Sequence, residues 1–521
     1  MRLPLIALAL TATSATAQVP FDILIRGGTV IAGNGQAPRV ADVGIRGDRI
    51  VFIGTTRADF PARRIIDARG LIVAPGFIDP HTHAAGDLAS AQSRDGVPNR
   101  ANLPYLLQGV TTVFTNPDGG GGVDIARQID GYTSKGIGTN AAVYIGQGSV
   151  RGAVVGATSA PPTPAQMDSM KRIVARAMDA GAIGMSTGLY YAPGSYSTTE
   201  EIIELAKVAA AKNGVYDSHI RDESSYTVGL IGAVNEVIRI GRETRMPVHI
   251  SHIKALGADV WGQSDTIIAL MKNARAEGID VTASQYPYTA SGTSVGASLL
   301  PRWAESGGGD SLRMRLADPS TRARIVREME DNLRRRGGAH TLLMTSTRDA
   351  GILGKRLDAI AQARGVPPVE AAIQIILNGG SSVASFNMNE KDIEKFMVQD
   401  FIVTDSDGSD GHPRKYGTYP KLIREYVRER KVLSLQHAID RSSGRVAKMF
   451  GLERIGVLAD SAFADVIVFD DATFTDRSTY EQPTLLAEGM KFVLVNGKVA
   501  VENGRFTGAM AGRVVKRQPR E

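Results

Sequence analysis

Eight apolar segments alternate with amphipathic helices through most of this chain, and this alternation constrains the fold more than any other feature. The predicted strands span residues 71–78, 110–115, 141–145, 182–186, 215–219, 248–253, 279–286 and 401–404. The predicted helices between them include residues 164–180, 199–211, 226–244 and 264–277. Repeated strand–helix units of this kind form a parallel sheet, and eight of them favour a (β/α)8 barrel over an open doubly wound sheet.

Short strands at both ends of the chain predict a second, smaller unit. Glycine turns separate the predicted strands between residues 21 and 66, as in a small antiparallel sheet. Similar strands recur near the C-terminus, where Asn496-Gly497 is a hairpin signal. Because the N-terminal half alone is too small to be stable, we expect one β-sandwich built from residues 18–70 and 456–521. The barrel, residues 71–455, would then be inserted between the two halves.

One segment between the seventh and eighth predicted strands fits neither unit. Residues 299–343 are polar and rich in arginine, and they contain Gly307-Gly308-Gly309. The segment is too long for an ordinary connection. We therefore expect a small insertion over the barrel mouth, which either forms part of a substrate lid or only decorates the surface.

The first 17 residues have the pattern of a secretory signal. Arg2 precedes a short apolar run, and Ala15-Thr16-Ala17 forms a cleavage site. The run is too short to span a bilayer stably, so we expect an exported protein, periplasmic or secreted, without a membrane segment. The chain contains no cysteine, which permits an oxidising compartment without demonstrating one.

The net charge of +6 is not concentrated in one long block. The densest basic cluster, Arg334 to Arg336, lies in a helix-like stretch just after several acidic residues. A solvated helix face explains this cluster better than a nucleic-acid surface does. We expect a small-molecule substrate and no nucleic-acid partner.

Histidines and aspartates collect at the ends of the predicted strands, where barrel enzymes have their active sites. His81 and His83 end the first strand, and a spacing of two puts both side chains on one face. Further candidates end or follow later strands: Asp118, His219, His252, Asp405 and Asp407. His249 would point away from the side that carries His252 if its strand is regular. Four of the chain's eight histidines thus lie on one rim, which core packing does not explain.

Imidazole and carboxylate ligands suit zinc or a similar divalent ion, and a bridging carboxylate can serve two ions. Such an ion lowers the pKa of bound water and polarises a carbonyl. A nearby carboxylate can accept a proton and pass it to a leaving nitrogen. The predicted reaction class is therefore metal-assisted hydrolysis of an amide.

Several long motifs occur in order along the chain. They are residues 75–83 (PGFIDPHTH), 181–189 (GAIGMSTGL), 191–196 (YAPGSY), 219–223 (HIRDE), 250–254 (ISHIK), 286–290 (YPYTA), 406–408 (SDG) and 412–418 (HPRKYGT). Together with the two-ended β-sandwich, they resemble the amidohydrolase superfamily and, within it, the N-acyl-D-amino-acid deacylases, or D-aminoacylases. The resemblance covers nearly the whole mature chain.

The resemblance implies a zinc-dependent hydrolase that cleaves an N-acyl-D-amino acid to a carboxylate and a free D-amino acid. It implies that His219 and His252 hold the tighter zinc, while His81 and His83 form a second, weaker site. It also makes Asp407 the catalytic acid/base.

Four further residues would bind the substrate by this resemblance. Lys254 and Arg414 would face the substrate carboxylate, and Tyr191 and Tyr288 would line the pocket. Lys254 lies two residues beyond His252, so strand alternation places both on one face. For Arg414, a salt bridge within its loop is the alternative.

The chain departs from the family pattern at three positions. Many members have a cysteine ligand in an Asn-Cys-Gly stretch, whereas this chain has Asn116-Pro-Asp118-Gly. Asp118 can supply oxygen ligands, and one or two bound ions are both compatible with it. Gln147 stands where the family often has histidine. Asp405 is a rival to Asp407, but only Asp407 fits the Ser-Asp-Gly pattern.

Two other functions are compatible with these motifs. A related amidohydrolase could act on dipeptides that contain a D-residue or on cyclic amides. An exported metal- or ligand-binding protein that has lost turnover is the non-enzymatic alternative. The presence of Asp407 together with all four rim histidines argues against the second.

Overall fold

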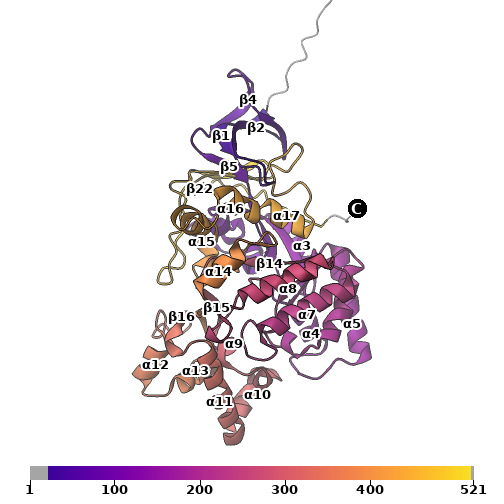
Figure 1. Cartoon of the computed structure of the whole chain (residues 1–521), viewed down its shortest axis with the longest axis vertical. Coiled ribbons are helices and arrows are strands. Elements are labelled where there is room, and N and C mark those ends of the chain that lie inside the picture. The colour runs from indigo at the N-terminus through magenta and orange to yellow at the C-terminus, as the bar shows by residue number, and fades with distance from the viewer. Residues whose placement is uncertain (1–20, 518–521) are drawn as a thin grey trace, which may run out of the picture.

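The computed structural model describes residues 21–517, so the predicted signal peptide, residues 1–17, lies outside the described residues. A nearly closed sheet of eight parallel strands forms the centre of the molecule (Figure 1). In sheet order the strands are β6 (Phe77–Asp79), β9 (Val110–Thr115), β10 (Asn140–Gly146), β11 (Gly184–Gly188), β12 (Val215–His219), β13 (Val248–Ile250), β14 (Val281–Gln285) and β18 (Ile402–Thr404). A parallel bridge between Thr82 and Gly408 joins the chain just beyond β6 and β18. The predicted barrel is confirmed.

Helices cover the outside of this sheet, and local signals explain where they begin and end. The helices α5 (Pro164–Ala180), α6 (Thr199–Ala210), α7 (Gly229–Thr244) and α8 (Ser264–Ala276) each pack against the next. Thr163 and Gln166 form a capping box at the start of α5, and Gly181 ends it in a left-handed conformation. The helix α7 begins later than predicted, because Asp222 accepts hydrogen bonds from the backbone of Thr227 and Gly229 and holds the preceding residues in a turn.

The first predicted strand, residues 71–78, is divided between two sheets. The strand β5 (Ile72–Pro75) pairs with strands of the terminal sheet described below, whereas β6 pairs with β9 of the barrel. At Gly76, between them, a Cβ atom would lie 2.1 Å from Thr111 Oγ1. Only glycine fits there, and the prediction of one continuous strand is wrong.

Strands from both ends of the chain form one continuous sheet, with the N-terminal strands at the far end of the molecule (Figure 1). Its order is β22 (Arg505–Phe506), β21 (Lys498–Glu502), β20 (Met490–Val495), β19 (Val466–Phe469), β5, β1 (Phe21–Val30), β2 (Arg39–Arg46) and β3 (Arg49–Gly54), with β4 (Ala62–Asp67) also paired to β1. Direct pairing of β19 with β5 joins the two ends. Val43 and Val468 lie in its shared apolar core.

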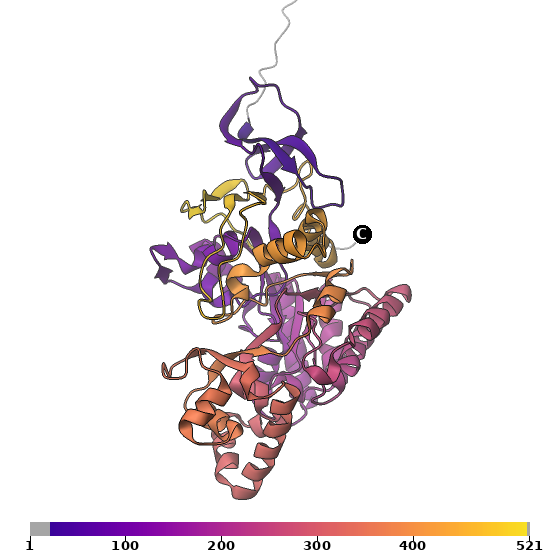
Figure 2. The same cartoon turned by 60° about the vertical axis from the view of Figure 1, so that its left-hand side comes forward.

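A separate unit lies between β14 and β18 and forms the lobe opposite the terminal sheet (Figure 2). Its elements are β15 (Ala290–Ser294), α9 (Val295–Leu299), α10 (Gly308–Ala317), α11 (Pro319–Arg335), β16 (Leu342–Thr347), α12 (Leu357–Arg364), α13 (Pro368–Leu377) and β17 (Ser381–Phe386). The strands form an antiparallel sheet in the order β15-β17-β16, and residues such as Ile325 and Leu342 form a core of its own. We call residues 290–386 the inserted unit. The polar segment predicted at residues 299–343 is its middle part.

The chain beyond β18 returns to the barrel through α16 (Leu435–Ser442) and α17 (Gly444–Phe450). Phe450 packs on the Phe114 ring, with the centroids 4.8 Å apart, and on the His249 ring at 4.9 Å. His249 therefore lies in apolar packing, away from the strand ends. Among residues 21–517, no helix combines the length and the apolar character needed to cross a membrane.

Candidate metal centre and active site

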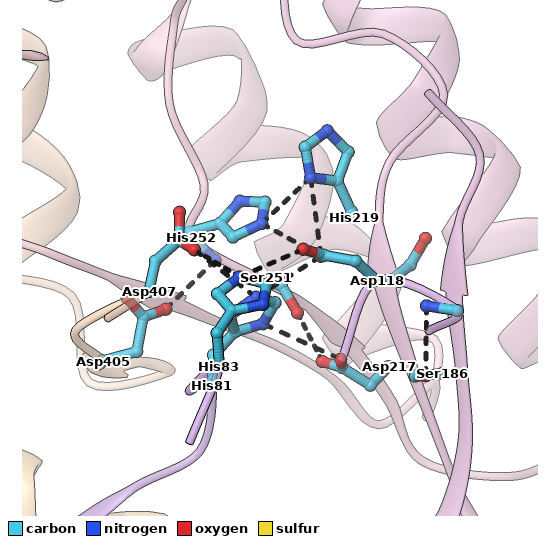
Figure 3. A network of polar contacts seen from close by, with 12 residues as sticks. His81, His83, Asp118, Ser186, Asp217, His219, Ser251, His252, Asp405 and Asp407 are labelled. Carbon is cyan, nitrogen blue, oxygen red and sulfur yellow. Dashed lines mark hydrogen bonds and ion pairs between the residues drawn. The ribbon is translucent and has the colours of Figure 1, made fainter. Parts of the chain in front are cut away.

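Four histidines and two aspartates from five strand ends converge at one edge of the barrel (Figure 3). They are His81 and His83 beyond β6, Asp118 beyond β9, His219 at the end of β12, His252 beyond β13 and Asp407 beyond β18. All five predicted metal ligands and the predicted catalytic aspartate are therefore neighbours in space. The residues come from chain positions more than 300 apart, so the parallel sheet is what assembles them.

Asp118 lies at the middle of this group. Its Oδ1 is 3.3 Å from His81 Nε2, 3.6 Å from His219 Nδ1 and 3.5 Å from His252 Nε2. His219 Nδ1 and His252 Nε2 are 3.1 Å apart. Ligand atoms on one tetrahedral ion with bonds of about 2.1 Å would be about 3.4 Å from each other. The separations among Asp118, His219 and His252 fit ligands of a single divalent ion, and His81 lies against the same carboxylate oxygen.

The second carboxylate oxygen of Asp118 faces a second group. His83 Nε2 is 3.5 Å from Asp118 Oδ2 and 3.2 Å from Asp407 Oδ1. His81 Nε2 is 3.8 Å from the same Asp407 oxygen. Oδ1 of Asp118 faces His81, His219 and His252, whereas Oδ2 faces His83. This carboxylate could therefore serve as a ligand to each of two ions.

Several atoms of the group are buried without a hydrogen-bond partner in the described part of the chain. They include both ring nitrogens of His81, His219 Nε2 and Asp118 Oδ1. Buried polar atoms are rarely left unsatisfied in this way. An ion that accepts the lone pairs of His81 and Asp118 would satisfy two of these atoms, so the donor set fits a metal.

The pKa shifts of this group show how strongly its acids and imidazoles interact. Burial alone would raise the pKa of Asp118, but the facing histidines outweigh it and hold the pKa well below its ordinary value. Burial lowers the pKa of His219. Asp118 is therefore a carboxylate and His219 a neutral imidazole, the forms that bind metals. Burial would lower the pKa of His81 and His252, but the facing carboxylates outweigh it and raise the pKa, to about 10 for His252, so a metal would have to displace a proton from each of these two rings.

Left-handed backbone conformations aim three of these side chains. The φ angles are 54° at Asp118, 37° at His252 and 45° at Asp407. Such angles are unfavourable for residues other than glycine and cluster at functional sites. Each residue lies just past a strand, where the turn replaces strand alternation and points the side chain inward. A Cβ atom at Gly188 would be only 2.2 Å from the Asp118 carbonyl oxygen, so glycine there makes room for the Asp118 turn.

Three further carboxylates surround the ligands. The sequence suggested no role for Glu223 or Asp217, and it made Asp405 a rival to Asp407 as the catalytic residue. Glu223 Oε1 is 3.1 Å from His252 Nδ1, and it lies four residues after His219 in the HIRDE motif. Asp217 accepts a hydrogen bond from Ser251 at 2.6 Å and lies 4.0 Å from His81 Nδ1. Because Asp217 lies two residues before His219 in β12, strand alternation places both side chains on the same face. Asp405 accepts a hydrogen bond from the His252 backbone at 3.1 Å and supports that residue.

A cavity of about 350 Å³ opens over this group. The barrel rim provides its floor, and the inserted unit provides one wall through Thr293, Arg336, Thr345, Ser382 and Val383. Tyr191 of the rim and Thr293 of the inserted unit meet across the cavity, with their oxygens 3.4 Å apart. Of the two roles expected for the insertion, a part of the substrate site or a mere surface decoration, the structure shows the first, because the inserted unit lines the cavity.

Three of the four predicted substrate-binding residues line the cavity: Tyr191, Lys254 and Arg414. Tyr288 is not among the lining residues. Its ring packs edge-on against His412, with centroids 5.4 Å apart, and Tyr286 faces the cavity. The reason is that β14 ends at Gln285, so the alternation that the sequence suggests does not continue to Tyr288.

Both cations predicted to bind the substrate carboxylate are paired with acids of the site. Lys254 Nζ lies 2.5 Å from Glu223 Oε1, and Arg414 Nη1 lies 2.8 Å from Asp407 Oδ2. Burial would raise the pKa of Asp407, but Arg414 and His252 outweigh it and keep the pKa below its ordinary value. Asp407 is therefore ionised. The salt bridge that the sequence offered as the alternative role of Arg414 is present, and its partner is Asp407, the predicted catalytic residue.

The basic cluster at residues 334–336 is only partly a solvated face. The Arg334 side chain is 60% exposed and pairs with Asp259. Arg336 is 2% exposed and lines the cavity. The prediction is wrong for Arg336, because the C-terminal end of α11 turns inward over the active site.

Comparison with known proteins shows that the chain is an amidohydrolase. The profile of the amidohydrolase family matches residues 64–501, and the chain belongs to this family. It is 33% identical to the D-aminoacylase of Alcaligenes xylosoxydans xylosoxydans, over 96% of this chain and 98% of that protein. It is also 33% identical to the N-acyl-D-glutamate deacylase of the same organism, over 92% and 93%. The resemblance predicted from the motifs is confirmed.

Solved structures agree with this placement. A D-aminoacylase with a binuclear metal centre superposes with a TM-score of 0.81 at 32% identity, covering 96% of this chain and all of that one. The N-acyl-D-glutamate deacylase of Bordetella bronchiseptica, complexed with zinc and a phosphonate inhibitor, gives a TM-score of 0.80 at 30% identity with the same coverage.

Proposed function

We propose that this protein is a zinc-dependent hydrolase that cleaves the amide bond of N-acyl-D-amino acids, giving a carboxylate and a free D-amino acid. The observation that carries the proposal is the convergence of four histidines, Asp118 and Asp407 below a cavity with cationic walls. The similarity to D-aminoacylase and N-acyl-D-glutamate deacylase over nearly the whole chain supports the same reaction.

The ligand assignments follow from the distances. His219, His252 and Asp118 would hold the tighter zinc, since their ligand atoms are 3.1–3.6 Å apart. His81, which faces Oδ1 of Asp118, and His83, which faces Oδ2, would hold a second, weaker ion or support the first. When bound, zinc would lower the pKa of a water molecule and polarise the scissile carbonyl.

Asp407 is positioned to move the proton. Its Oδ1 faces the histidine group, where it can accept a proton from the attacking water. Arg414 holds Oδ2 and so fixes the orientation of the carboxylate. Because Asp407 is ionised before the reaction, it can first accept the proton and then donate it to the leaving nitrogen.

Lys254 and Arg414 give the cavity the charge needed to bind the substrate α-carboxylate. Both are buried and both reach the cavity beside the metal ligands. Tyr191 lies between this region and the inserted unit, and its ring is 4.7 Å from the His219 ring. Substrate held by these groups would present its amide to Asp407 and the histidines.

A substrate panel tests the proposal. Zinc-loaded protein would be assayed with N-acetyl-D-amino acids, their L-counterparts, dipeptides that contain a D-residue, and hydantoins, with release of free amine or ring opening as the measurement. We expect rapid hydrolysis of the N-acetyl-D-amino acids only. Faster turnover of the dipeptides or hydantoins would replace the proposed substrate class, and equal rates on both enantiomers would contradict D-specificity.

We also propose that the protein is exported. The support is the signal-like pattern that ends at Ala17. N-terminal sequencing of protein recovered from its native host, fractionated into cytoplasm and extracytoplasmic material, tests this. A mature chain that begins at Gln18 outside the cytoplasm is the expected result, and an intact N-terminus inside the cytoplasm would refute it.

A further inference from the structure

Arg336 is a buried cation in the wall of the active-site cavity, and the proposed reaction leaves it without a role. It follows the last residue of α11 and is 2% exposed. Within residues 21–517 its guanidinium makes only neutral contacts: Nε donates to the Ser298 carbonyl at 3.1 Å, and Nη2 donates to Tyr190 Oη at 3.3 Å. The group also lies 5.8 Å from the centre of the Tyr226 ring.

The charge of Arg336 has no acidic partner within the described chain. Nη1 is buried without a hydrogen-bond partner, and no carboxylate among residues 21–517 forms an ion pair with this guanidinium. A guanidinium does not lose its proton in proteins, so burial leaves an uncompensated positive charge. Such an arrangement is unfavourable unless an anion binds there.

The other cations of the cavity differ from Arg336. Lys254 lies 2.5 Å from Glu223, and Arg414 lies 2.8 Å from Asp407. These two are placed to bind the α-carboxylate in the proposed function. Arg336 is therefore available for a second anionic group, and it lies on the inserted unit instead of the rim.

Tyr190 connects Arg336 to the metal centre. Its ring stacks on the His219 ring with centroids 5.7 Å apart, and its hydroxyl accepts the hydrogen bond from Arg336. One tyrosine side chain thus separates the guanidinium from a metal-ligand candidate. Tyr190 also lines a second cavity of about 470 Å³, and the buried Tyr226 hydroxyl in that wall has no hydrogen-bond partner in residues 21–517. A substituent that projects from the reacting amide along Tyr190 would meet unsatisfied hydrogen-bond donors.

We propose that Arg336 binds a second carboxylate of the substrate, beyond the α-carboxylate, and so makes the enzyme prefer dianionic N-acyl-D-amino acids. The inference rests on the proposed function and adds a specificity residue to it. The second carboxylate can belong to the amino-acid side chain or to the acyl group. A neutral amide of the same shape can accept one hydrogen bond from Arg336 but leaves the buried positive charge without a counter-charge, and the loss of a charged hydrogen bond corresponds to about 10- to 100-fold in kcat/KM.

Two matched substrate pairs test this proposal and distinguish the two sources. N-acetyl-D-glutamate is compared with N-acetyl-D-glutamine, and N-succinyl-D-leucine with N-succinamoyl-D-leucine. The full-length, zinc-loaded wild type should prefer the carboxylate over the amide by about 10- to 100-fold in at least one pair. The pair that shows the preference identifies the position of the second carboxylate.

Variants assign the preference to Arg336. Arg336→Met should bring the carboxylate-to-amide ratio close to one, and Arg336→Lys, which keeps a charge, should retain part of it. Arg334→Met is the matched control, because Arg334 is exposed, lies on the same helix end and does not line the cavity. It should keep the wild-type ratio. Zinc content and thermal unfolding of each variant show that the fold is intact.

Two results would overturn the proposal. One is no carboxylate preference in either wild-type pair, and the other is a preference that survives in folded Arg336→Met, including the case of an equal loss on both substrates. If Arg336→Met does not fold, the wild-type ratio and Arg336→Lys still decide. Failure of zinc-loaded wild type on all four substrates would instead refute the proposed function, and this inference with it.

Discussion

The barrel rim and the inserted unit meet at one cavity but are built differently. On the rim, the side chains proposed for chemistry lie at the ends of buried parallel strands, and neighbours such as Asp405 hold them through hydrogen bonds. The inserted unit has a separate apolar core and three short strands, and it faces the cavity with Thr293 and Arg336. The residues proposed for chemistry are thus held by the central sheet, whereas one wall of the substrate cavity belongs to the inserted unit. Substitutions in the two regions should affect different kinetic constants.

The largest effect should come from Asp407→Asn on the rim. Asparagine keeps the shape and can still accept a hydrogen bond from Arg414, but it cannot accept the proton of the attacking water. We expect kcat to fall about 10²- to 10⁴-fold while zinc remains bound, because general acid–base catalysis contributes that much. Steady-state kinetics with metal analysis of the same sample provides the measurement.

Asp405→Asn is the matched control for this prediction. Asp405 lies two residues earlier, accepts a hydrogen bond from the His252 backbone and is not among the residues that line the cavity. Its loss of activity should be smaller than that of Asp407→Asn. Full activity in Asp407→Asn would remove the catalytic assignment, and a larger loss in Asp405→Asn would transfer it to the rival carboxylate.

Two histidines of neighbouring sequence should differ in zinc binding. His252 Nε2 faces Asp118 at 3.5 Å, whereas His249 Nδ1 lies 2.8 Å from Thr282 Oγ1 on the other side of the strand. His252→Gln should lose most of the bound zinc after dialysis, and His249→Gln should retain the wild-type amount. Equal zinc contents in the two variants would contradict the assignment of the rim.

The same pair predicts a pH dependence of stability. Burial, together with the charges of His81 and His252, lowers the pKa of His249 from 6.5 to about 3. Below pH 6.5 the unfolded chain takes up a proton that the folded chain does not, so stability falls as the pH decreases toward 3. This histidine should contribute a loss of about 2 kcal/mol between pH 7 and pH 5.

His249→Gln isolates that contribution, since glutamine can still bond to Thr282 but does not titrate. The free energy of unfolding, measured with denaturant at both pH values, should decrease less in the variant than in the wild type. The same decrease in both proteins would show that His249 does not titrate with a shifted pKa.

The smallest effect should come from the inserted unit. Thr293→Val removes the hydroxyl that lies 3.4 Å from Tyr191 Oη, a contact between the two regions. Because one neutral hydrogen bond is lost, KM should rise about 2- to 10-fold with kcat nearly unchanged. A fall in kcat comparable to that of Asp407→Asn would mean that the inserted unit takes part in the chemistry.

The same difference between regions explains what could be predicted from the sequence. The barrel strands are apolar runs, and the rim histidines follow them directly, so both the fold and the ligands could be predicted. The strands β15 and β17 are rich in serine and lack such a signal, and they were therefore not expected. The division at Gly76 depends on contact with Thr111, which lies on another strand.

Single positions were missed where tertiary packing overrides local pattern. Tyr286 and Tyr288 have the same parity along an extended strand, and only the end of β14 at Gln285 separates their directions. Arg336 belongs to a run of three arginines that has the pattern of a solvated helix end. Its burial depends on Ser298 and Tyr190, which are distant in sequence.

Zinc titration of metal-depleted protein tests the central claim most directly. Hydrolysis of N-acetyl-D-glutamate and N-acetyl-D-leucine and of their L-enantiomers is followed as zinc is added back. We expect cleavage of at least one D-substrate to appear with zinc and to saturate at one or two ions per chain, while the L-enantiomers remain uncleaved. Full hydrolysis by the metal-depleted protein, or equal rates on both enantiomers, would contradict that claim.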